Sequence, residues 1–195
     1  RYLAGGDPAI SDDPLPPMSI SPEQQQAVAA QLAVNSDTSI LALCPGAEYG
    51  PAKRWPIEHF AKVARHMHQQ GWQVWLLGSD KDKAVAEQID ALSEQVCRNF
   101  AGSTDLAEAV DLMSLADAVI SNDSGLMHVA AALDKKLIAL YGSSDPGFTP
   151  PLHPDAEIIT LKLDCSPCFK RECPLGHTRC LADIAPERVI AAIPD

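Results

Sequence analysis

The sequence predicts a doubly wound α/β domain, in which a parallel sheet is covered by helices on both faces. From residue 39 onward, short apolar runs alternate with amphipathic stretches of helical period. The runs are apolar along their whole length, which is typical of parallel strands that are buried on both faces. Apolar strands that alternate with helices in this way indicate a doubly wound sheet.

Each element is marked by its own start or stop signal. The first helix begins after Ser21, a hydroxyl N-cap that is followed by Pro22, and runs to about Ala33. Another begins at Pro56, where apolar residues recur every three or four positions until Gly71 ends the pattern. Further helices are predicted over 82–93, after the cap Asp105, over 125–133 and after Pro186. Strands are predicted over 39–44, 73–77, 96–100, 118–121, 137–141 and 157–161.

The start of the chain differs in composition from the rest. Prolines stand at positions 8, 14, 16, 17 and 22, and proline fixes φ and removes a backbone donor. We therefore expect residues 1–38 to form a proline-rich linker and the first helix, and residues 39–195 to form the domain. Because the chain begins with Arg1 rather than Met, we also expect it to be a fragment of a longer protein.

Composition and charge exclude several classes of function. Apolar residues make up 46% and charged residues 21% of the chain, as in ordinary soluble globular proteins. No apolar run approaches the roughly 18 residues of a membrane span, and no secretory signal is recognisable. The net charge of −11 argues against nucleic-acid binding. Residues 39–70 nevertheless carry four cations against two carboxylates, net +2, which favours a small anionic ligand there.

Ligands of an open parallel sheet lie outside the carboxyl ends of its strands. The segment that follows the strand at 118–121 runs directly into a helix, whose first N–H groups and dipole suit a phosphate. Ser124 adds a hydroxyl, Gly125 allows close backbone approach, and His128 lies one helical turn after Ser124. Asp123 is placed to contact a sugar hydroxyl. The alternative is that Asp123 and Ser124 only cap the helix and His128 only packs.

The loop that follows the first strand of the domain is the second candidate. It contains Gly46 and ends in Lys53 and Arg54, a point charge and a planar fork that both suit phosphate oxygens. The alternative is a solvated Lys-Arg pair beside a packed helix start. The G-x-G-x-x-G pattern of dinucleotide sites and the G-x-x-x-x-G-K-[ST] pattern of nucleoside triphosphate loops are both missing, which argues against those ligands.

A cysteine cluster with the spacing C-x2-C-x4-C-x6-C forms the third candidate. It consists of Cys165, Cys168, Cys173 and Cys180, and His177 lies within it. Four clustered thiols in a chain with no export signal favour a metal over disulfides. The Cys165-x-x-Cys168 pair could hold one side of a structural zinc ion, with Cys173 and either Cys180 or His177 completing the site. Reduced packing thiols, a disulfide or an iron–sulfur cluster remain open alternatives.

Three motifs, in order, resemble those of the ADP-heptose:lipopolysaccharide heptosyltransferases, most closely the heptosyltransferase II branch. They are Pro45-Gly-Ala with Lys53-Arg-Trp-Pro-x-x-x-Phe60, Leu77-Gly-Ser-Asp80, and Asn122-Asp-Ser-Gly-Leu-Met-His-x-Ala-Ala-Ala-Leu133. The resemblance extends from about residue 39 to the C-terminus. It implies the GT-B architecture, two Rossmann-like halves around a cleft, and this chain is similar to the C-terminal half, which binds the nucleotide-sugar donor.

The resemblance also implies roles for individual residues. Lys53 would contact the donor pyrophosphate and, with Asp123, would be a catalytic group on the donor side. The full donor-binding set would be Gly46, Ala47, Lys53, Arg54, Asp80, Asp123, Ser124, Gly125 and His128. The family's catalytic base, an acidic residue of the other half, has no counterpart here.

The expected function is therefore heptosyl transfer from ADP-heptose to the lipopolysaccharide inner core, with inversion and without a catalytic metal. The resemblance implies a cytoplasmic enzyme peripheral to the inner membrane, and a lone donor half would be inactive. Two alternatives remain: another GT-B nucleotide-sugar enzyme, either a transferase for a different sugar or an epimerase, or a non-enzymatic zinc-bearing interaction domain.

Overall fold

The computed structural model describes residues 18–34 and 38–194, so most of the proline-rich start lies outside the described residues. The strands are β1 (Ile40–Cys44), β2 (Gln73–Leu76), β3 (Cys97–Asn99), β4 (Ala118–Asn122), β5 (Lys136–Leu140) and β6 (Glu157–Ile159). The α-helices are α1 (Pro22–Gln31), α2 (Ile57–Gln69), α3 (Lys83–Leu92), α4 (Leu106–Ser114), α5 (Gly125–Ala132), α6 (Arg179–Ala182) and α7 (Pro186–Ile190). Two 3-10 turns, η1 (Pro51–Lys53) and η2 (Asp80–Asp82), complete the set.

The six strands form one parallel sheet in the order β3-β2-β1-β4-β5-β6. The chain winds outward from β1 through β2 to β3, then returns to the other side of β1 as β4. The switch point of this doubly wound sheet therefore lies between β1 and β4, where the connections leave in opposite directions. In the register of these two strands, Cys44 pairs with Ser121.

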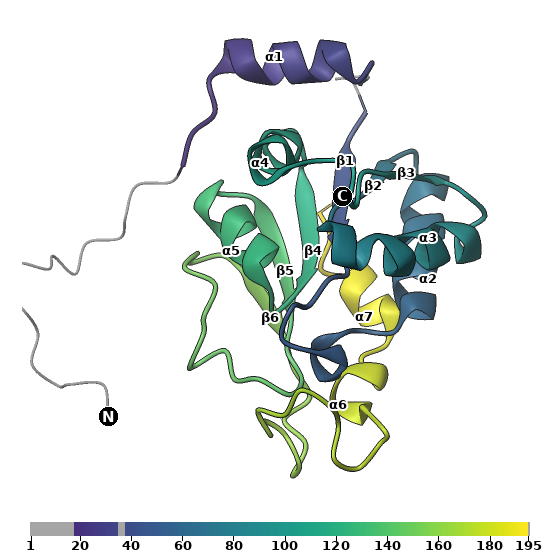
Figure 1. The fold of residues 1–195 in the computed structure, drawn as a ribbon, viewed down its shortest axis with the longest axis vertical. Coiled ribbons are helices and arrows are strands. Elements are labelled where there is room, and N and C mark those ends of the chain that lie inside the picture. The colour runs from purple at the N-terminus through teal and green to yellow at the C-terminus, as the bar shows by residue number, and fades with distance from the viewer. Residues whose placement is uncertain (1–17, 35–37, 195) are drawn as a thin grey trace, which may run out of the picture.

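Side chains that alternate along each strand build two cores, one on each face of the sheet. Leu41 and Leu43 of β1 face a core that includes Phe60 of α2 and Val189 of α7. The intervening residues of β1 face a second core with α4 and α5, which includes Met127. Figure 1 shows α2, α3 and α7 on one side of the sheet and α4 and α5 on the other. This arrangement confirms the predicted fold class.

Two predicted helix caps, Ser21 and Asp105, are present in the structure. The Ser21 hydroxyl accepts a hydrogen bond from the N–H of Gln24 at the start of α1. Asp105 and Glu108 form a reciprocal capping box at the start of α4, with both bonds at 2.8 Å. α1 contacts α4, since Gln24 Nε2 donates to Asp111 Oδ1 at 2.7 Å.

Several short elements are absent from the sequence prediction. η1, η2 and the four-residue α6 have too few residues to show a helical period, and they follow turns rather than apolar runs. Strand and helix ends differ from the prediction by one or two residues, for example at β6, which ends at Ile159. Within the described residues, no helix is long and apolar enough to cross a membrane.

Candidate functional site

The loops that follow β1 and β4 meet at the switch point and are joined by the side chain of Asn122. This residue ends β4 and is fully buried. Its Nδ2 donates to the carbonyl of Pro45 at 2.8 Å, and its Oδ1 accepts from the backbone N–H of Trp55 at 3.1 Å. Both ends of the loop over residues 45–55 are therefore fixed to β4.

Trp55, the last residue of this loop, is held in place by contacts with Phe60 and Ile184. Its side chain is 1% exposed and packs edge-on against Phe60 of α2, with ring centroids 4.9 Å apart. Its Nε1–H donates to the carbonyl of Ile184 at 3.0 Å. The predicted helix-start packing is thus present, and it holds the preceding cations at the strand ends rather than in open solvent.

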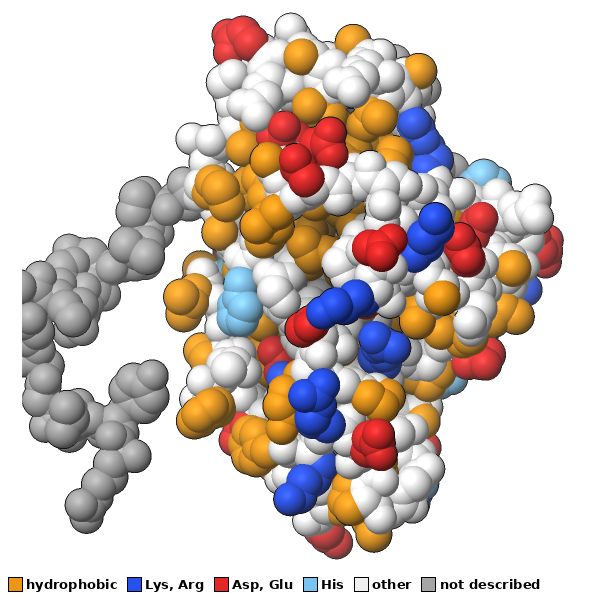
Figure 2. Space-filling view, in the orientation of Figure 1, with side chains coloured by type: hydrophobic (Ala, Val, Ile, Leu, Met, Phe, Trp, Pro, Cys, Tyr) orange, Lys and Arg blue, Asp and Glu red, His pale blue; other side chains and the backbone are white. Residues whose placement is uncertain are grey.

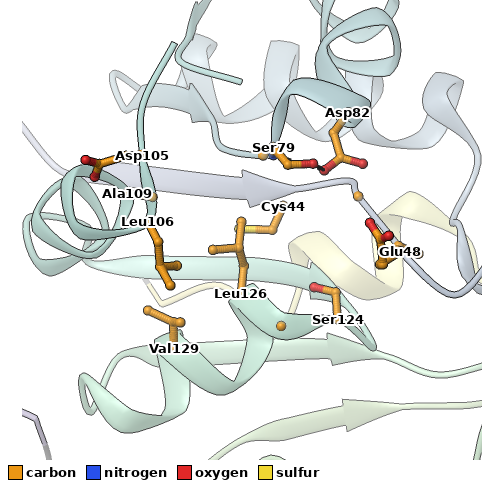
Figure 3. Close-up of a pocket in the computed structure, with 14 residues that line it drawn as sticks. Cys44, Glu48, Ser79, Asp82, Asp105, Leu106, Ala109, Ser124, Leu126 and Val129 are labelled. Carbon is orange, nitrogen blue, oxygen red and sulfur yellow. Dashed lines mark hydrogen bonds between the residues drawn. The ribbon is translucent and has the colours of Figure 1, made fainter. Parts of the chain in front are cut away.

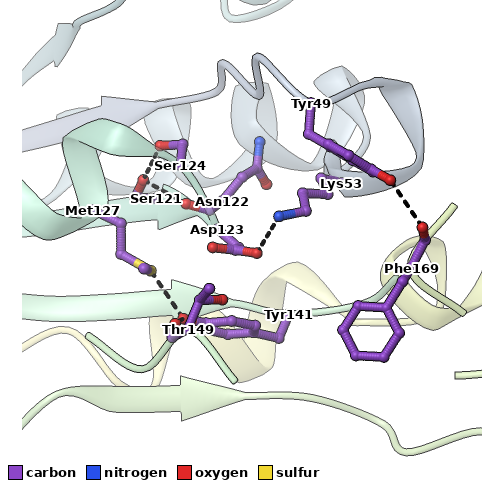
Figure 4. Close-up of polar contacts among 10 residues, drawn as sticks. All are labelled: Tyr49, Lys53, Ser121, Asn122, Asp123, Ser124, Met127, Tyr141, Thr149 and Phe169. Atoms are coloured by element: carbon purple, nitrogen blue, oxygen red, sulfur yellow. Dashed lines mark hydrogen bonds and ion pairs between the residues drawn. The ribbon is translucent and has the colours of Figure 1, made fainter. Parts of the chain in front are cut away.

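Lys53 reaches across the switch point to Asp123 (Figure 4). The Lys53 ammonium lies 2.5 Å from Asp123 Oδ2 and 5.2 Å from the centre of the Tyr49 ring. The two charged side chains are 16% and 6% exposed, so the pair is poorly screened by water. Asp123 therefore positions the cation beside the start of α5.

The start of α5 has no side-chain cap. Ser124 is the N-cap residue, but its side chain accepts no hydrogen bond from the first turn and lies 3.2 Å from the hydroxyl of Ser121. A Cβ added to Gly125 would meet no atom within 4 Å, so the space beside the first helical residue is open. This end of α5 presents its dipole and N–H groups without a competing side chain, as an anion site requires.

A cavity of about 400 Å³ opens beside this helix start. Figure 3 shows its lining side chains, which come from the ends of β1 and β2 and from α4 and α5. Leu106, Leu126 and Val129 form an apolar wall, and Ser79, Asp82 and Ser124 stand on the polar side. Figure 2 shows orange side chains around this hollow and Lys and Arg side chains on the surface below it. Gly46, Ala47 and Gly125, three of the residues predicted to bind the donor, also line it.

Asp82 is a cavity residue that the sequence analysis missed. Its Oδ2 accepts from the hydroxyl of Ser79 at 2.8 Å and from the Ser79 N–H at 3.0 Å, which forms a capping box around η2. A Cβ on Gly46 would lie 2.6 Å from this carboxylate, so any larger residue there would force the Asp82 side chain to move. The Ser79-x-x-Asp82 spacing was the available signal.

Arg54 faces the same carboxylate. Its guanidinium lies 3.8 Å from Asp82 Oδ1, and its buried Nε has no hydrogen-bond partner among the described residues. A buried donor without a partner is costly.

Four of the nine predicted donor residues line the cavity, and five do not: Lys53, Arg54, Asp80, Asp123 and His128. Lys53 and Asp123 are paired with each other, and Arg54 faces Asp82. Asp80 is exposed in η2, its Oδ1 near Gly102, and it does not line the cavity. His128 is exposed on α5 and also lies outside the lining. Both lie within one helical turn of lining residues, Asp82 and Ser124 respectively.

Tyr141 is a fully buried residue close enough to Asp123 to be affected by its charge. Its hydroxyl donates to the carbonyl of Thr149 at 2.6 Å (Figure 4). Burial, and then the charge of Asp123, raise the pKa of this phenol far above its ordinary value. Tyr141 is therefore a neutral donor that fixes the segment following β5.

The four clustered cysteines line one small hollow together with His177 and Ser143, outside the main cavity. All six cysteines of the chain are free. Among the described residues, no group of three or more His, Cys, Asp or Glu side chains is placed to hold a metal ion. The pKa of Cys173 is lowered chiefly by the N–H of Thr178, and burial together with the neighbouring thiols raises that of Cys180.

The strand order and the cavity at the switch point define the class: a Rossmann-like α/β domain with a cavity at the carboxyl edge of the sheet. The model of glycosyltransferase family 9 (heptosyltransferase) matches residues 11–179. The chain belongs to this family.

Individual relatives agree with the family match. Lipopolysaccharide heptosyltransferase 2 of Salmonella typhimurium is 44% identical over 90% of this chain and 51% of its own length. Lipooligosaccharide heptosyltransferase 2 of Haemophilus influenzae is 44% identical over 94% of this chain and 56% of its own length. The solved structure of Escherichia coli ADP-heptose lps heptosyltransferase II superposes with a TM-score of 0.82 at 41% identity, covering 94% of this chain and 54% of that one. The chain spans about half the length of these relatives.

Proposed function

We propose that this chain is the donor-binding half of a heptosyltransferase that transfers heptose from ADP-heptose to the lipopolysaccharide inner core. The observation that carries the proposal is the Lys53–Asp123 pair beside the uncapped start of α5. A diphosphate bound there would meet an ammonium and a helix N-terminus at once. Family membership and the 44% identity to heptosyltransferases support the choice of donor.

The geometry suits the departure of a nucleoside diphosphate. In an inverting transfer, the acceptor oxygen bonds to the anomeric carbon while the bond from that carbon to the phosphate oxygen breaks. The electron pair leaves with ADP, and negative charge grows on the diphosphate. Lys53 and the N–H groups of α5 would stabilise that charge without a catalytic metal. By resemblance to the family, the base that takes the acceptor proton belongs to the acceptor-binding half.

The apolar wall of the cavity suits the nucleobase. Leu106 is 68% exposed, although it stands beside Leu126 and Val129 at the cavity mouth. A flat heteroaromatic base would cover part of this exposed apolar surface, while the hydroxyl of Ser79 and the carboxylate of Asp82 lie on the polar side for ribose or base contacts. Asp80 and His128 would then contact the donor only from the rim.

The acceptor and the cellular location follow from the same proposal. The acceptor would be a heptose hydroxyl of the growing inner core, bound through the other half of the cleft. The enzyme would work in the cytoplasm, peripheral to the inner membrane, where this acceptor is presented. In this proposal the chain alone would bind the donor weakly and would not catalyse heptosyl transfer.

A thermal-shift panel tests the donor class. ADP-heptose and ADP should raise the melting temperature of the chain, because a ligand that binds only the folded state stabilises it. UDP- and GDP-sugars at the same concentration should leave it unchanged. A larger shift with a UDP- or GDP-sugar would replace this proposal by another GT-B nucleotide-sugar enzyme. No shift with any nucleotide would favour the non-enzymatic interaction domain.

A further inference from the structure

The cysteine-rich segment 165–180 has a feature that the donor site does not use. Cys165, Cys168, Cys173 and Cys180 come together around one hollow of about 20 Å³, although they are spread over sixteen residues. The tight turn after Cys173 carries Gly176 at φ +71°, and the N–H of Thr178 donates to Cys173 Sγ at 3.4 Å. A backbone that encloses a sulfur atom with N–H groups stabilises a thiolate.

The same hollow is lined by a buried hydroxyl group that has no hydrogen-bond partner among the described residues. Ser143 is 1% exposed, lines the same hollow, and its Oγ has no hydrogen-bond partner among the described residues. A buried hydroxyl without an acceptor is costly, and a metal-bound thiolate would accept a hydrogen bond from it.

The charge of the segment suits an anionic metal centre. Lys170, Arg171 and Arg179 stand against Glu172, so residues 165–180 carry a net +2. One Zn²⁺ held by four thiolates carries a net −2. The two charges offset each other within the segment.

The same segment is bound to the loop that carries Lys53. The carbonyl of Arg171 accepts from the N–H of Ala52 at 3.0 Å, and the carbonyl of Phe169 accepts from the Tyr49 hydroxyl at 2.9 Å (Figure 4). Gly50 is packed so closely that an added Cβ would lie 2.5 Å from the Arg171 carbonyl oxygen. Ala52 itself lines the thiol hollow.

We infer that Cys165, Cys168, Cys173 and Cys180 form a structural Zn²⁺ site that braces the Lys53 loop. In the described structure these side chains do not form a metal-binding group, so Zn²⁺ binding would require the four sulfur atoms around the hollow to turn toward one point. The four thiols lose their protons to solvent as the four Zn–S bonds form, and no electron is transferred. Only the bracing effect on ligand binding rests on the proposed function.

Metal analysis of the intact chain tests the site. After incubation with ZnCl2 and removal of free ion, we expect about one zinc per chain. Cys168→Ser and Cys173→Ser should lose it, whereas the matched control Cys97→Ser, which changes a half-buried strand thiol, should keep it. Less than about 0.2 zinc per chain in the unaltered protein would overturn the site.

Cobalt provides a measurement that does not depend on whether the variants fold. Titration of the unaltered, metal-free chain with CoCl2 should give the visible absorption of a tetrahedral thiolate complex, and ZnCl2 should remove it. Absence of this absorption would overturn the four-thiolate assignment.

The bracing effect has its own readout. Calorimetry with ADP should show affinity falling about fivefold or more when the chain is stripped of zinc, and returning when zinc is restored. Equal ADP affinity in both states would overturn the bracing while leaving the zinc count intact. Absence of ADP binding in both states, with one zinc bound, would instead contradict the donor site.

Discussion

The ammonium of Lys53 lies 2.5 Å from the carboxylate of Asp123, and this contact joins the loop after β1 to the loop after β4. The two residues stand seventy positions apart in the chain, at the point between β1 and β4 where the windings of the described sheet diverge. The Lys53 ammonium therefore lies beside the start of α5 because β1 and β4 are neighbours in the sheet.

The pair should act as one unit in donor binding. Lys53→Ala and Asp123→Ala are each expected to weaken ADP-heptose binding by about 1–3 kcal/mol, and the double variant by less than the sum. Calorimetry measures all three. Lys62→Ala is the matched control, because Lys62 forms an exposed pair with Glu187 on the far helices and should leave the affinity unchanged. Unaltered affinity in both single variants would contradict the site.

The substitution Gly125→Ala should lower donor affinity while leaving the stability of the fold nearly unchanged. Gly125→Ala should change the unfolding free energy by less than about 0.5 kcal/mol, because the added methyl meets no atom within 4 Å. It should lower ADP-heptose affinity about tenfold, since the methyl occupies space where a phosphate approaches the helix. Urea denaturation and calorimetry give the two numbers. In Gly46→Ala, by contrast, the methyl meets the Asp82 carboxylate, and we expect lost stability as well. Full affinity in Gly125→Ala would place the phosphates elsewhere.

Asn122 should matter for stability rather than for contact with the donor. Asn122→Ala leaves the Trp55 N–H and the Pro45 carbonyl without partners in a buried position, at a cost of about 2 kcal/mol or more. Asn99→Ala removes one bond to the N–H of Ala101 at the half-buried sheet edge and should cost about 1 kcal/mol. Urea denaturation compares them, and an equal or smaller loss for Asn122→Ala would show that this side chain does not fix the loop.

Cys44 should be unreactive although it lines the cavity. Burial raises the pKa of its thiol to about 12, so the thiolate fraction at pH 8 is only about 10⁻⁴. Iodoacetamide followed by peptide mapping should leave Cys44 unlabelled in the folded chain and labelled in urea. Raising the pH toward 12 increases the thiolate fraction and should increase labelling. Rapid alkylation of Cys44 in the folded protein at pH 8 would contradict its burial.

The strands were predictable because continuous apolar runs leave few other structures possible. The runs that became β1 and β4 also identified the loops that carry Lys53 and Asp123, since strand ends define the ligand edge. Their direct contact was not predictable from spacing, because it depends on β4 returning to pair with β1. A sequence shows which residues end strands but not which strands become neighbours.

The choice between Asp80 and Asp82 shows a second limit. Both carboxylates lie in the three-residue turn η2, and the family motif ends at the first of them. A 3-10 turn points residues two positions apart in different directions, so only the backbone geometry places Asp82 in the cavity and Asp80 in solvent. The Ser79 capping box was the one local signal for the second carboxylate.

A crystal structure of the chain with ADP-heptose bound tests the central claim most directly. We expect diphosphate oxygens to lie about 3 Å from the Lys53 ammonium and from N–H groups at the start of α5. We also expect the adenine to lie against the wall formed by Leu106, Leu126 and Val129. A diphosphate bound away from both Lys53 and the start of α5 would contradict it.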